Sequence, residues 1–196
     1  MSALNVEPES YNGYGWDDLV RIWEETDVPE GCTVEIIEGI VTVAPPPAND
    51  HNNIADDLQR ELYRVIPRDW GIFQTQGLAV PSRKGLFIPD LAVVPKAALQ
   101  RPGHFIAASE ARLIAEITSP SNPGHDRISK PAAYACAGVP LYLLIDSWAP
   151  GGPTVTLFSE PEGDVYRSHH AVKFGDPIEL PAPFGITLET GSFPVG

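Results

Sequence analysis

The sequence contains few cysteines, and those few limit the kinds of site the protein can hold. Only Cys32 and Cys136 occur among 196 residues, and no metal-ligand spacing surrounds either of them. We therefore expect no disulfide framework, and we expect both cysteines to be reduced thiols in a cytoplasmic protein.

Long apolar runs are also missing. No stretch of 18 apolar residues occurs, so no membrane-spanning helix is expected. The first ten residues, MSALNVEPES, lack the basic and apolar regions of a secretory signal. With 43% hydrophobic residues the chain can still form a core. We expect a single domain over residues 1–196, because no internal repeat or linker divides the sequence.

Basic residues are scarce, which restricts binding to nucleic acids. Thirteen Lys and Arg residues stand against 26 Asp and Glu residues, so the net charge is −13. Proteins that bind DNA over a long footprint present a basic face, because neutralisation of phosphates dominates their affinity. A bound divalent cation would reverse the sign of the charge locally. Any binding to DNA is therefore expected to be weak or transient.

Apolar periodicity divides the chain into short helices and strands. We expect a hairpin within 33–44 that turns at Glu38-Gly39, and a helix capped by Asn49 or Asp50. Residues 95–110 are expected to form a loop with at most a short helix. The other predicted helices cover 15–25 and 126–138, and the other predicted strands cover 71–80, 87–94, 112–118, 141–146, 154–159 and 165–174. This order predicts an α/β or α+β fold with one mixed, strongly bent sheet flanked by helices.

Two acidic residues occur inside apolar strands. Asp90 lies within FIPDLAVV, and Glu116 lies within LIAEIT. Burial of an unpaired carboxylate costs several kcal/mol or forces it to bind a proton, and two neighbouring carboxylates also repel each other. A Mg²⁺ ion between them would resolve both problems, because it prefers oxygen ligands. The alternative is that both acids point to solvent at a sheet edge.

A lysine follows the second acid on the next predicted helix. Lys130 could pair with the carboxylates, position a water molecule or stabilise negative charge on a phosphate. Tyr134 lies four residues later, so it shares a helix face with Lys130. Taken alone, a lysine in a first helical turn is more often an ordinary surface residue.

Several motifs in fixed order resemble those of a known family. They are EIIEG (residues 35–39), His51 at a helix start, IPDLAVV, EITSPSN, AGVPLYLLID and the spaced series Asp126, Lys130 and Tyr134. From about residue 16 to residue 158 the chain resembles a widespread bacterial family of stand-alone putative restriction endonucleases, formerly a domain of unknown function. The resemblance implies a restriction-endonuclease-like core of the PD-(D/E)xK type, followed here by a C-terminal extension of strands and turns.

The resemblance also implies roles for individual residues. Pro89-Asp90 matches the PD motif, and Glu116 matches the acid of the second motif. Thr118 occupies the usual position of the lysine, and the family resemblance moves that lysine to Lys130. Glu35 and His51 match recurrent family positions near the same site, where we expect them, with Tyr134, to have supporting roles.

The implied function is metal-dependent hydrolysis of phosphodiester bonds in DNA. Asp90 and Glu116 would bind Mg²⁺ or Mn²⁺, and Lys130 would act beside them. One alternative is a catalytically inactive binding or regulatory module, which the acidic composition and Thr118 favour. Another is a structural homo-oligomer whose buried acids pair with arginines such as Arg112 or Arg127. A homo-oligomer, such as a homodimer, is expected in either case.

Overall fold

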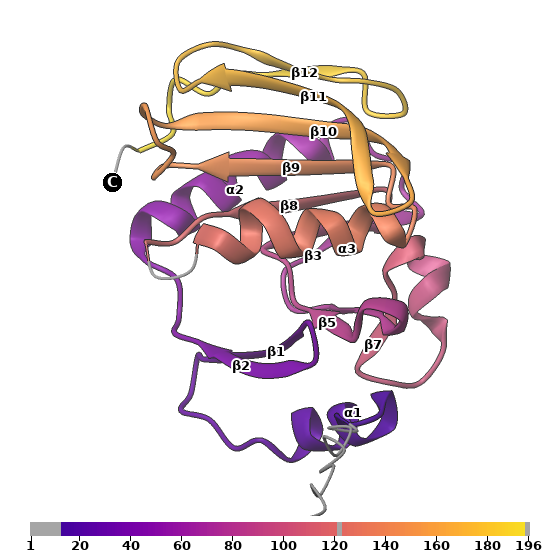
Figure 1. The fold of residues 1–196 in the computed structure, drawn as a ribbon. Helices are drawn as coiled ribbons and strands as arrows, with labels where there is room; N and C mark the ends of the chain where they lie inside the picture. The colour runs from indigo at the N-terminus through magenta and orange to yellow at the C-terminus, as the bar shows by residue number, and fades with distance from the viewer. Residues whose placement is uncertain (1–12, 121–122, 195–196) are drawn as a thin grey trace, which may run out of the picture.

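The computed structural model describes residues 13–120 and 123–194 (Figure 1). The N-terminal segment MSALNVEPES therefore lies outside the described residues. Ser121 and Asn122 of the EITSPSN motif also lie outside them. None of the helices in the described ranges is both long enough and apolar enough to cross a membrane.

Most strands belong to two mixed sheets. The five-stranded sheet has the order β2 (Ile40–Ala44), β1 (Thr33–Ile37), β5 (Gly85–Phe87), β4 (Gly77–Val80) and β7 (Phe105–Ala107). The six-stranded sheet has the order β11 (Val165–Lys173), β10 (Thr154–Glu162), β9 (Leu141–Asp146), β8 (Leu113–Ile117), β6 (Leu91–Pro95) and β3 (Trp70–Phe73). The pairs β4–β7 and β8–β9 are parallel, and the other pairs are antiparallel. The predicted α+β class with mixed pairing is confirmed, but these strands form two mixed sheets where one bent sheet was expected, and β12 (Ile178–Leu180) and β13 (Ile186–Leu188) pair in a third, two-stranded sheet.

Two predicted strands are each divided between the sheets. The segment 71–80 forms the end of β3 and all of β4, and 87–94 forms the end of β5 and most of β6. Between β5 and β6 the chain passes from one sheet to the other through Ile88, Pro89 and Asp90. Proline has no N–H to donate to a ladder, which fits its place in this break. Asp90 therefore lies in the connection between strands, and the expectation that it lies within a strand is wrong.

The three predicted helices are present as α1 (Trp16–Glu25), α2 (Asn49–Tyr63) and α3 (Lys130–Cys136). The N-cap of α2 is Ala48, so the expected capping by Asn49 or Asp50 is wrong. The segment 95–110 contains more structure than predicted, because β7 pairs in parallel with β4 between the 3-10 turns Lys96–Gln100 and Ala108–Glu110. A third 3-10 turn covers Pro81–Arg83, and the C-terminal extension forms the hairpin β12 (Ile178–Leu180) and β13 (Ile186–Leu188).

Side chains of β8 alternate between two hydrophobic clusters. Leu113, Ala115 and Ile117 face the first cluster, which includes the buried stripe of α2 and the C-terminal hairpin. Ile114 faces the second cluster, which includes Tyr134 of α3 and the five-stranded sheet. In Figure 1, α2 and α3 lie on either side of the six-stranded sheet. Because side chains two residues apart share a strand face, Glu116 points to the side of α3.

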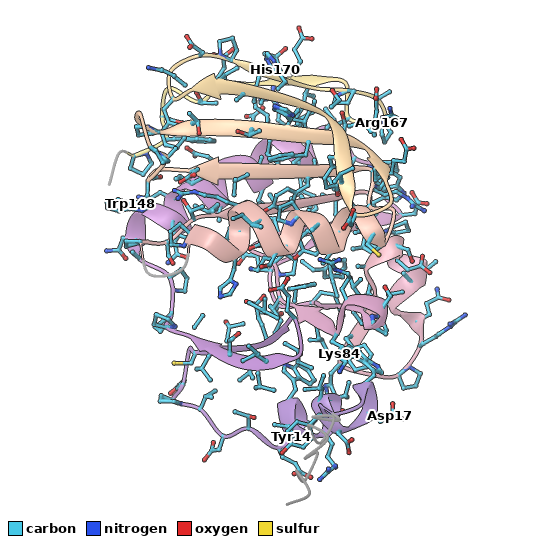
Figure 2. The ribbon with its side chains drawn as sticks, viewed as in Figure 1. Tyr14, Asp17, Lys84, Trp148, Arg167 and His170 are labelled. Carbon is cyan, nitrogen blue, oxygen red and sulfur yellow. The ribbon has the colours of Figure 1, made fainter. Side chains whose placement is uncertain are left out.

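The lower end of the molecule in Figure 2 is tied to the five-stranded sheet by a lysine. Lys84 Nζ donates a hydrogen bond of 3.1 Å to the carbonyl of Tyr14, just before α1.

The predicted turn at Glu38-Gly39 joins β1 to β2, and both residues have positive φ, 52° and 83°. This is the conformation that a two-residue hairpin loop requires, so the hairpin prediction is confirmed.

Candidate functional site

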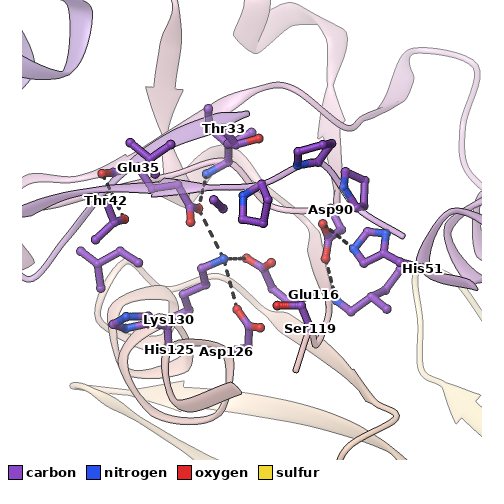
Figure 3. A pocket seen from close by; sticks show the side chains of 18 of the residues that line it. Thr33, Glu35, Thr42, His51, Asp90, Glu116, Ser119, His125, Asp126 and Lys130 are labelled. Atoms are coloured by element: carbon purple, nitrogen blue, oxygen red, sulfur yellow. Dashed lines mark hydrogen bonds and ion pairs between the residues drawn. The ribbon is translucent and has the colours of Figure 1, made fainter. Parts of the chain in front are cut away.

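A pocket of about 310 Å³ lies between the two sheets, at the start of α3 (Figure 3). Its walls bring together side chains that are far apart in the sequence. They come from β1, the connection before β6, β8 and the turn before α3. Four carboxyl groups and one lysine line it: Glu35, Asp90, Glu116, Asp126 and Lys130. The two predicted metal ligands and the predicted lysine therefore share one pocket, and the alternative of two solvent-facing acids at a sheet edge does not describe this arrangement.

Lys130 is buried at the centre of the acidic cluster. Its side chain is only 6% exposed, and Nζ lies 3.0 Å from Oε1 of Glu116, 3.2 Å from Oδ1 of Asp126 and 3.4 Å from Oε1 of Glu35. Burial alone would lower the pKa of Lys130, but the surrounding carboxylates, Glu116 first, raise that pKa well above its usual value. Lys130 is therefore an ammonium at neutral pH and not the ordinary surface residue of the alternative reading.

A π-helical turn at His125–Ser129 positions Lys130 and Asp126. The backbone N–H of Lys130 donates to the carbonyl of His125, five residues earlier. Tyr142 of β9 donates a 2.7 Å hydrogen bond to the carbonyl of Asp126. Such turns are rare, and they occur frequently at functional sites. Here the turn places the side chains of Asp126 and Lys130 within 3.2 Å of each other.

The neighbouring Arg127 points away from the pocket and fixes the same turn. Its guanidinium donates from Nε to Oδ2 of Asp146 at 2.7 Å and from Nη2 to Oδ1 at 2.9 Å. These bonds outweigh the effect of burial and hold the pKa of Asp146 below its usual value. Thr118 also donates to Oδ1 of Asp146, at 2.9 Å. The alternative in which the buried acids pair with Arg127 does not describe this arrangement, because the carboxylate partner of Arg127 is Asp146.

Glu116 is the most deeply buried of the four site acids, with 2% of its surface exposed. Oε1 accepts a hydrogen bond of 2.9 Å from the hydroxyl of Tyr134, so Tyr134 lies beside Glu116. Burial raises the pKa of Glu116 well above its usual value; Lys130 lowers it, and Asp90, Asp126 and Glu35 raise it further. The described contacts of Glu116 involve Oε1, and its carboxyl group lines the pocket.

Asp90 is held by two contacts that fix its direction. Oδ2 accepts a 2.7 Å hydrogen bond from the backbone N–H of Ile117, next to Glu116 on the adjacent strand. Oδ1 lies 2.9 Å from Nε2 of His51, in the first turn of α2. Because a carboxylate only accepts, Nε2 of His51 carries the proton in this contact. Nδ1 of His51 is buried and has no hydrogen-bond partner in the described ranges.

Glu35 of β1 contacts the connection between β5 and β6 and also contacts α3. Its Oε1 accepts a 2.8 Å hydrogen bond from the backbone N–H of Ile88, in the connection that leads to Asp90. The same oxygen lies near Lys130. Both residues that were expected near the site on family resemblance, Glu35 and His51, are therefore placed there.

Asp126 is the site residue that the sequence reasoning did not assign. It is 9% exposed, and burial raises its pKa, an effect that Lys130 opposes. The signal was present in the sequence, because Asp126 stands four residues before Lys130, a spacing that puts two helical side chains on one face.

The donor set suits a hard divalent cation that keeps part of its water shell. Asp90 and Glu116 present carboxylate oxygens to one pocket, and Mg²⁺ is usually bound by one or two carboxylates together with water and substrate phosphate. No cluster of three or more His, Cys, Asp or Glu side chains forms a ready metal cage in the described part of the chain. The residues therefore fit an ion that the substrate helps to bind, and do not fit a closed structural site.

Comparison with known proteins identifies the family and the fold. No curated protein matches the chain. A crystal structure of a putative nuclease belonging to DUF820, from Anabaena variabilis, superposes with a TM-score of 0.71, at 17% sequence identity, and covers 92% of this chain and 97% of that chain. The family model Uma2, described as "Putative restriction endonuclease", matches residues 16–191. The match extends beyond residue 158 and through the C-terminal hairpin. The chain belongs to the Uma2 putative restriction endonuclease family.

Proposed function

We propose that this protein is a nuclease that hydrolyses phosphodiester bonds in DNA with a divalent metal ion, Mg²⁺ or Mn²⁺. The observation that carries the proposal is the convergence of Asp90, Glu116 and the buried ammonium of Lys130 in one pocket. Family membership supports nuclease chemistry, and the metal dependence and the DNA substrate are inferred from the residues.

Asp90 and Glu116 would hold the ion. When bound, such an ion supplies Lewis acidity at the phosphate and lowers the pKa of a water molecule. In the hydrolysis, the oxygen of a water molecule bonds to phosphorus, the P–O ester bond breaks, and a proton passes to the leaving oxygen. His51 and the N–H of Ile117 hold the carboxylate of Asp90 in place for this reaction.

Lys130 would have two functions. Without substrate, its ammonium offsets the mutual repulsion of Glu35, Glu116 and Asp126. With substrate, the same charge would stabilise the negative charge that develops on the phosphate. The hydroxyl of Tyr134 fixes the oxygen of Glu116 that faces Lys130, and thereby keeps the two groups at a defined distance.

The proposal is tested by incubating the purified protein with supercoiled plasmid and with short oligonucleotides in Mg²⁺, Mn²⁺, Ca²⁺ or EDTA. We expect cleavage that requires a divalent ion and is lost in Glu116→Gln. The matched control is Glu179→Gln, an exposed carboxylate on β12. Absence of cleavage with every metal and substrate would favour the binding-module alternative, which the net charge of −13 and the threonine at position 118 support.

Lys130→Met removes the charge of the lysine and leaves both proposed metal ligands in place. The same cleavage assay measures its effect. We expect the cleavage rate to fall by roughly a hundredfold, the effect of removing one preorganised electrostatic group. Lys130→Arg should restore only part of the rate, because a planar guanidinium does not place its charge where an ammonium does. The folded fraction of each variant is checked by circular dichroism, since Lys130 is buried among carboxylates.

A further inference from the structure

A second cavity, of about 650 Å³, adjoins the candidate site. Thr33 and Ile88 line both cavities, so the two lie on either side of these residues. The remaining wall of the second cavity comes from α1, the start of β1, the connection 74–76 between β3 and β4, and the segment before β7. Its volume falls within the range of about 300–1,000 Å³ that is typical of small-ligand pockets.

One wall of this second cavity is an aromatic ring held in a fixed orientation. The indole Nε1 of Trp23 donates a 2.7 Å hydrogen bond to the carbonyl of Val34. The same ring packs edge-on against Phe105, with ring centroids 6.3 Å apart. Because the indole that lines the cavity is already fixed, a ligand that packs against it would cause little further loss of side-chain entropy.

The rest of the wall is polar but carries no basic side chain. Four polar residues that are exposed to solvent line the cavity: Glu24, Gln74, Thr75 and His104. No lysine or arginine within residues 13–120 and 123–194 lines it. A phosphate in this cavity would be repelled by the carboxylate of Glu24 and would have no permanently charged cation in the cavity wall to bind. A flat, uncharged ligand with hydrogen-bonding groups along its edge fits better, and a nucleobase is such a ligand.

The distribution of cations favours an unpaired strand over a duplex. Among the described residues, Lys130 is the only lysine or arginine that lines the candidate site, and it already contacts three carboxylates. On α2, Arg60 and Arg64 pair with Asp56 and Glu61 of the same helix. Duplex interfaces are large and strongly basic, whereas single strands also bind through stacking of bases on aromatic rings.

We propose that the second cavity binds the base of a nucleotide adjacent to the scissile phosphate, and that the substrate of the candidate site is therefore an unpaired nucleic acid strand. The inference rests on the proposed nuclease function, because the phosphate must occupy the neighbouring pocket. Stacking on Trp23 and hydrogen bonds from Gln74, Thr75 and His104 would supply the affinity that basic residues supply in duplex-binding proteins.

The test measures binding of fluorescein-labelled, hydrolysis-resistant phosphorothioate 8-mers by anisotropy, in Mn²⁺ and in EDTA. The single strand, the duplex of the same sequence and a single strand with abasic positions are compared. We expect the single strand to bind at least about tenfold more tightly than the duplex, and the abasic strand to lose most of this advantage.

Substitutions in the wall of the second cavity test whether the preference for single strands depends on this cavity. Thr75→Trp fills the cavity from its exposed rim and His104→Ala removes a polar group; each should weaken single-strand binding by roughly fivefold or more. The matched controls are Thr187→Trp on β13 and His170→Ala on β11, which are exposed residues outside the cavity wall, and His170 lies at the opposite end of the molecule in Figure 2. Controls should bind as wild type does.

The outcomes separate this inference from the nuclease proposal. Equal or tighter binding of the duplex, no binding of the single strand, or identical behaviour of cavity variants and controls would overturn the base-binding inference, even if the protein cleaves DNA. Selective binding of single strands that depends on the second cavity, in a protein that cleaves nothing, would overturn the nuclease proposal and leave base binding intact.

Discussion

His51 contacts Asp90 but is not expected to touch the metal ion. Its Nε2 lies 2.9 Å from Oδ1 of Asp90, so it acts on the proposed ligand from outside. Removal of such a partner typically lowers metal affinity by about ten- to a hundredfold. We predict a loss of this size for Mn²⁺ in His51→Ala, measured by calorimetric titration, with His170→Ala as the control. Equal affinity in His51→Ala and wild type would show that the contact does not support metal binding.

Glu116 should make the stability of the metal-free protein depend on pH. Its pKa is raised by burial, partly offset by Lys130, so the folded protein disfavours the ionised carboxyl. Wild type should then lose stability as the pH rises above the unfolded pKa of about 4.3 and toward the folded pKa. Glutamine cannot ionise, and Glu116→Gln should therefore gain stability relative to wild type across that window.

Chemical denaturation in EDTA between pH 5 and pH 8 measures this difference. Glu179→Gln, at an exposed position, should follow wild type at every pH. A gap between Glu116→Gln and wild type that does not change with pH would mean that the carboxyl of Glu116 titrates alike in the folded and unfolded chains.

Sequence reasoning reached the main site residues because their chemistry is unusual for their surroundings. Asp90 and Glu116 are acids within apolar runs, and Lys130 was found through the order of the family motifs. Asp126 was not assigned, because an acid four residues before a lysine on a helix is common on protein surfaces, and the burial of both side chains depends on the fold. The second cavity could not be predicted, since its walls come from segments between residues 23 and 104 that the fold brings together.

The hairpin of β1 and β2 positions Glu35 at the pocket, and Gly39 sets its turn. Gly39 has a φ of 83°, and an added Cβ would lie 3.3 Å from Cδ of Lys84. A side chain in this left-handed conformation costs about 1–2 kcal/mol. We predict that Gly39→Ala lowers the free energy of unfolding by about that amount, measured by denaturation in urea. Gly191→Ala, where nothing lies within 4 Å of the added Cβ, should have a far smaller effect. Equal losses in both variants would contradict the assigned role of the turn.

At the level of elements, turns and helix ends that depend on local sequence were predicted better than pairing between distant segments. The turn Glu38-Gly39 is local, and so is the end of the predicted helix 126–138. The helix α3 ends at Cys136, Gly138 has a φ of 74°, and Val139 N–H donates to the carbonyl of Tyr134. The division of residues 71–80 and 87–94 between two sheets was missed, because an apolar run does not specify its hydrogen-bonding partner. The strand β7 was missed for the same reason, since it depends on parallel pairing with β4.

For the whole molecule, the net charge of −13 should limit the contribution of phosphate contacts to binding. The logarithm of affinity for DNA falls with the logarithm of salt concentration, with a slope of about −0.7 to −0.9 for each neutralised phosphate. Because only Lys130 offers a permanent cation in the candidate pocket, we predict a slope between about 0 and −3. Anisotropy titrations from low to high salt measure it. A slope near −6 would reveal a basic surface that this account does not include.

The homo-oligomeric state, the cytoplasmic location and the single-domain organisation stay predictions from the sequence. The α+β class and the family are established by the fold and by the match over residues 16–191. The net charge of the whole molecule argues against tight binding of DNA. The arrangement of side chains around Lys130 favours binding of a metal ion and a phosphate. The two are compatible if the ion and base stacking provide the affinity that a basic surface would otherwise provide.

The central claim is that a divalent ion held by Asp90 and Glu116 drives phosphodiester hydrolysis. Its most direct test is the single-turnover rate of cleavage of a short oligonucleotide as a function of Mn²⁺ concentration, for wild type and Asp90→Asn. We predict that wild type saturates with Mn²⁺ and that Asp90→Asn needs at least about tenfold more Mn²⁺ or does not cleave. Identical rates and identical Mn²⁺ dependence in the two proteins would contradict the account, because the ion would then act somewhere other than at Asp90.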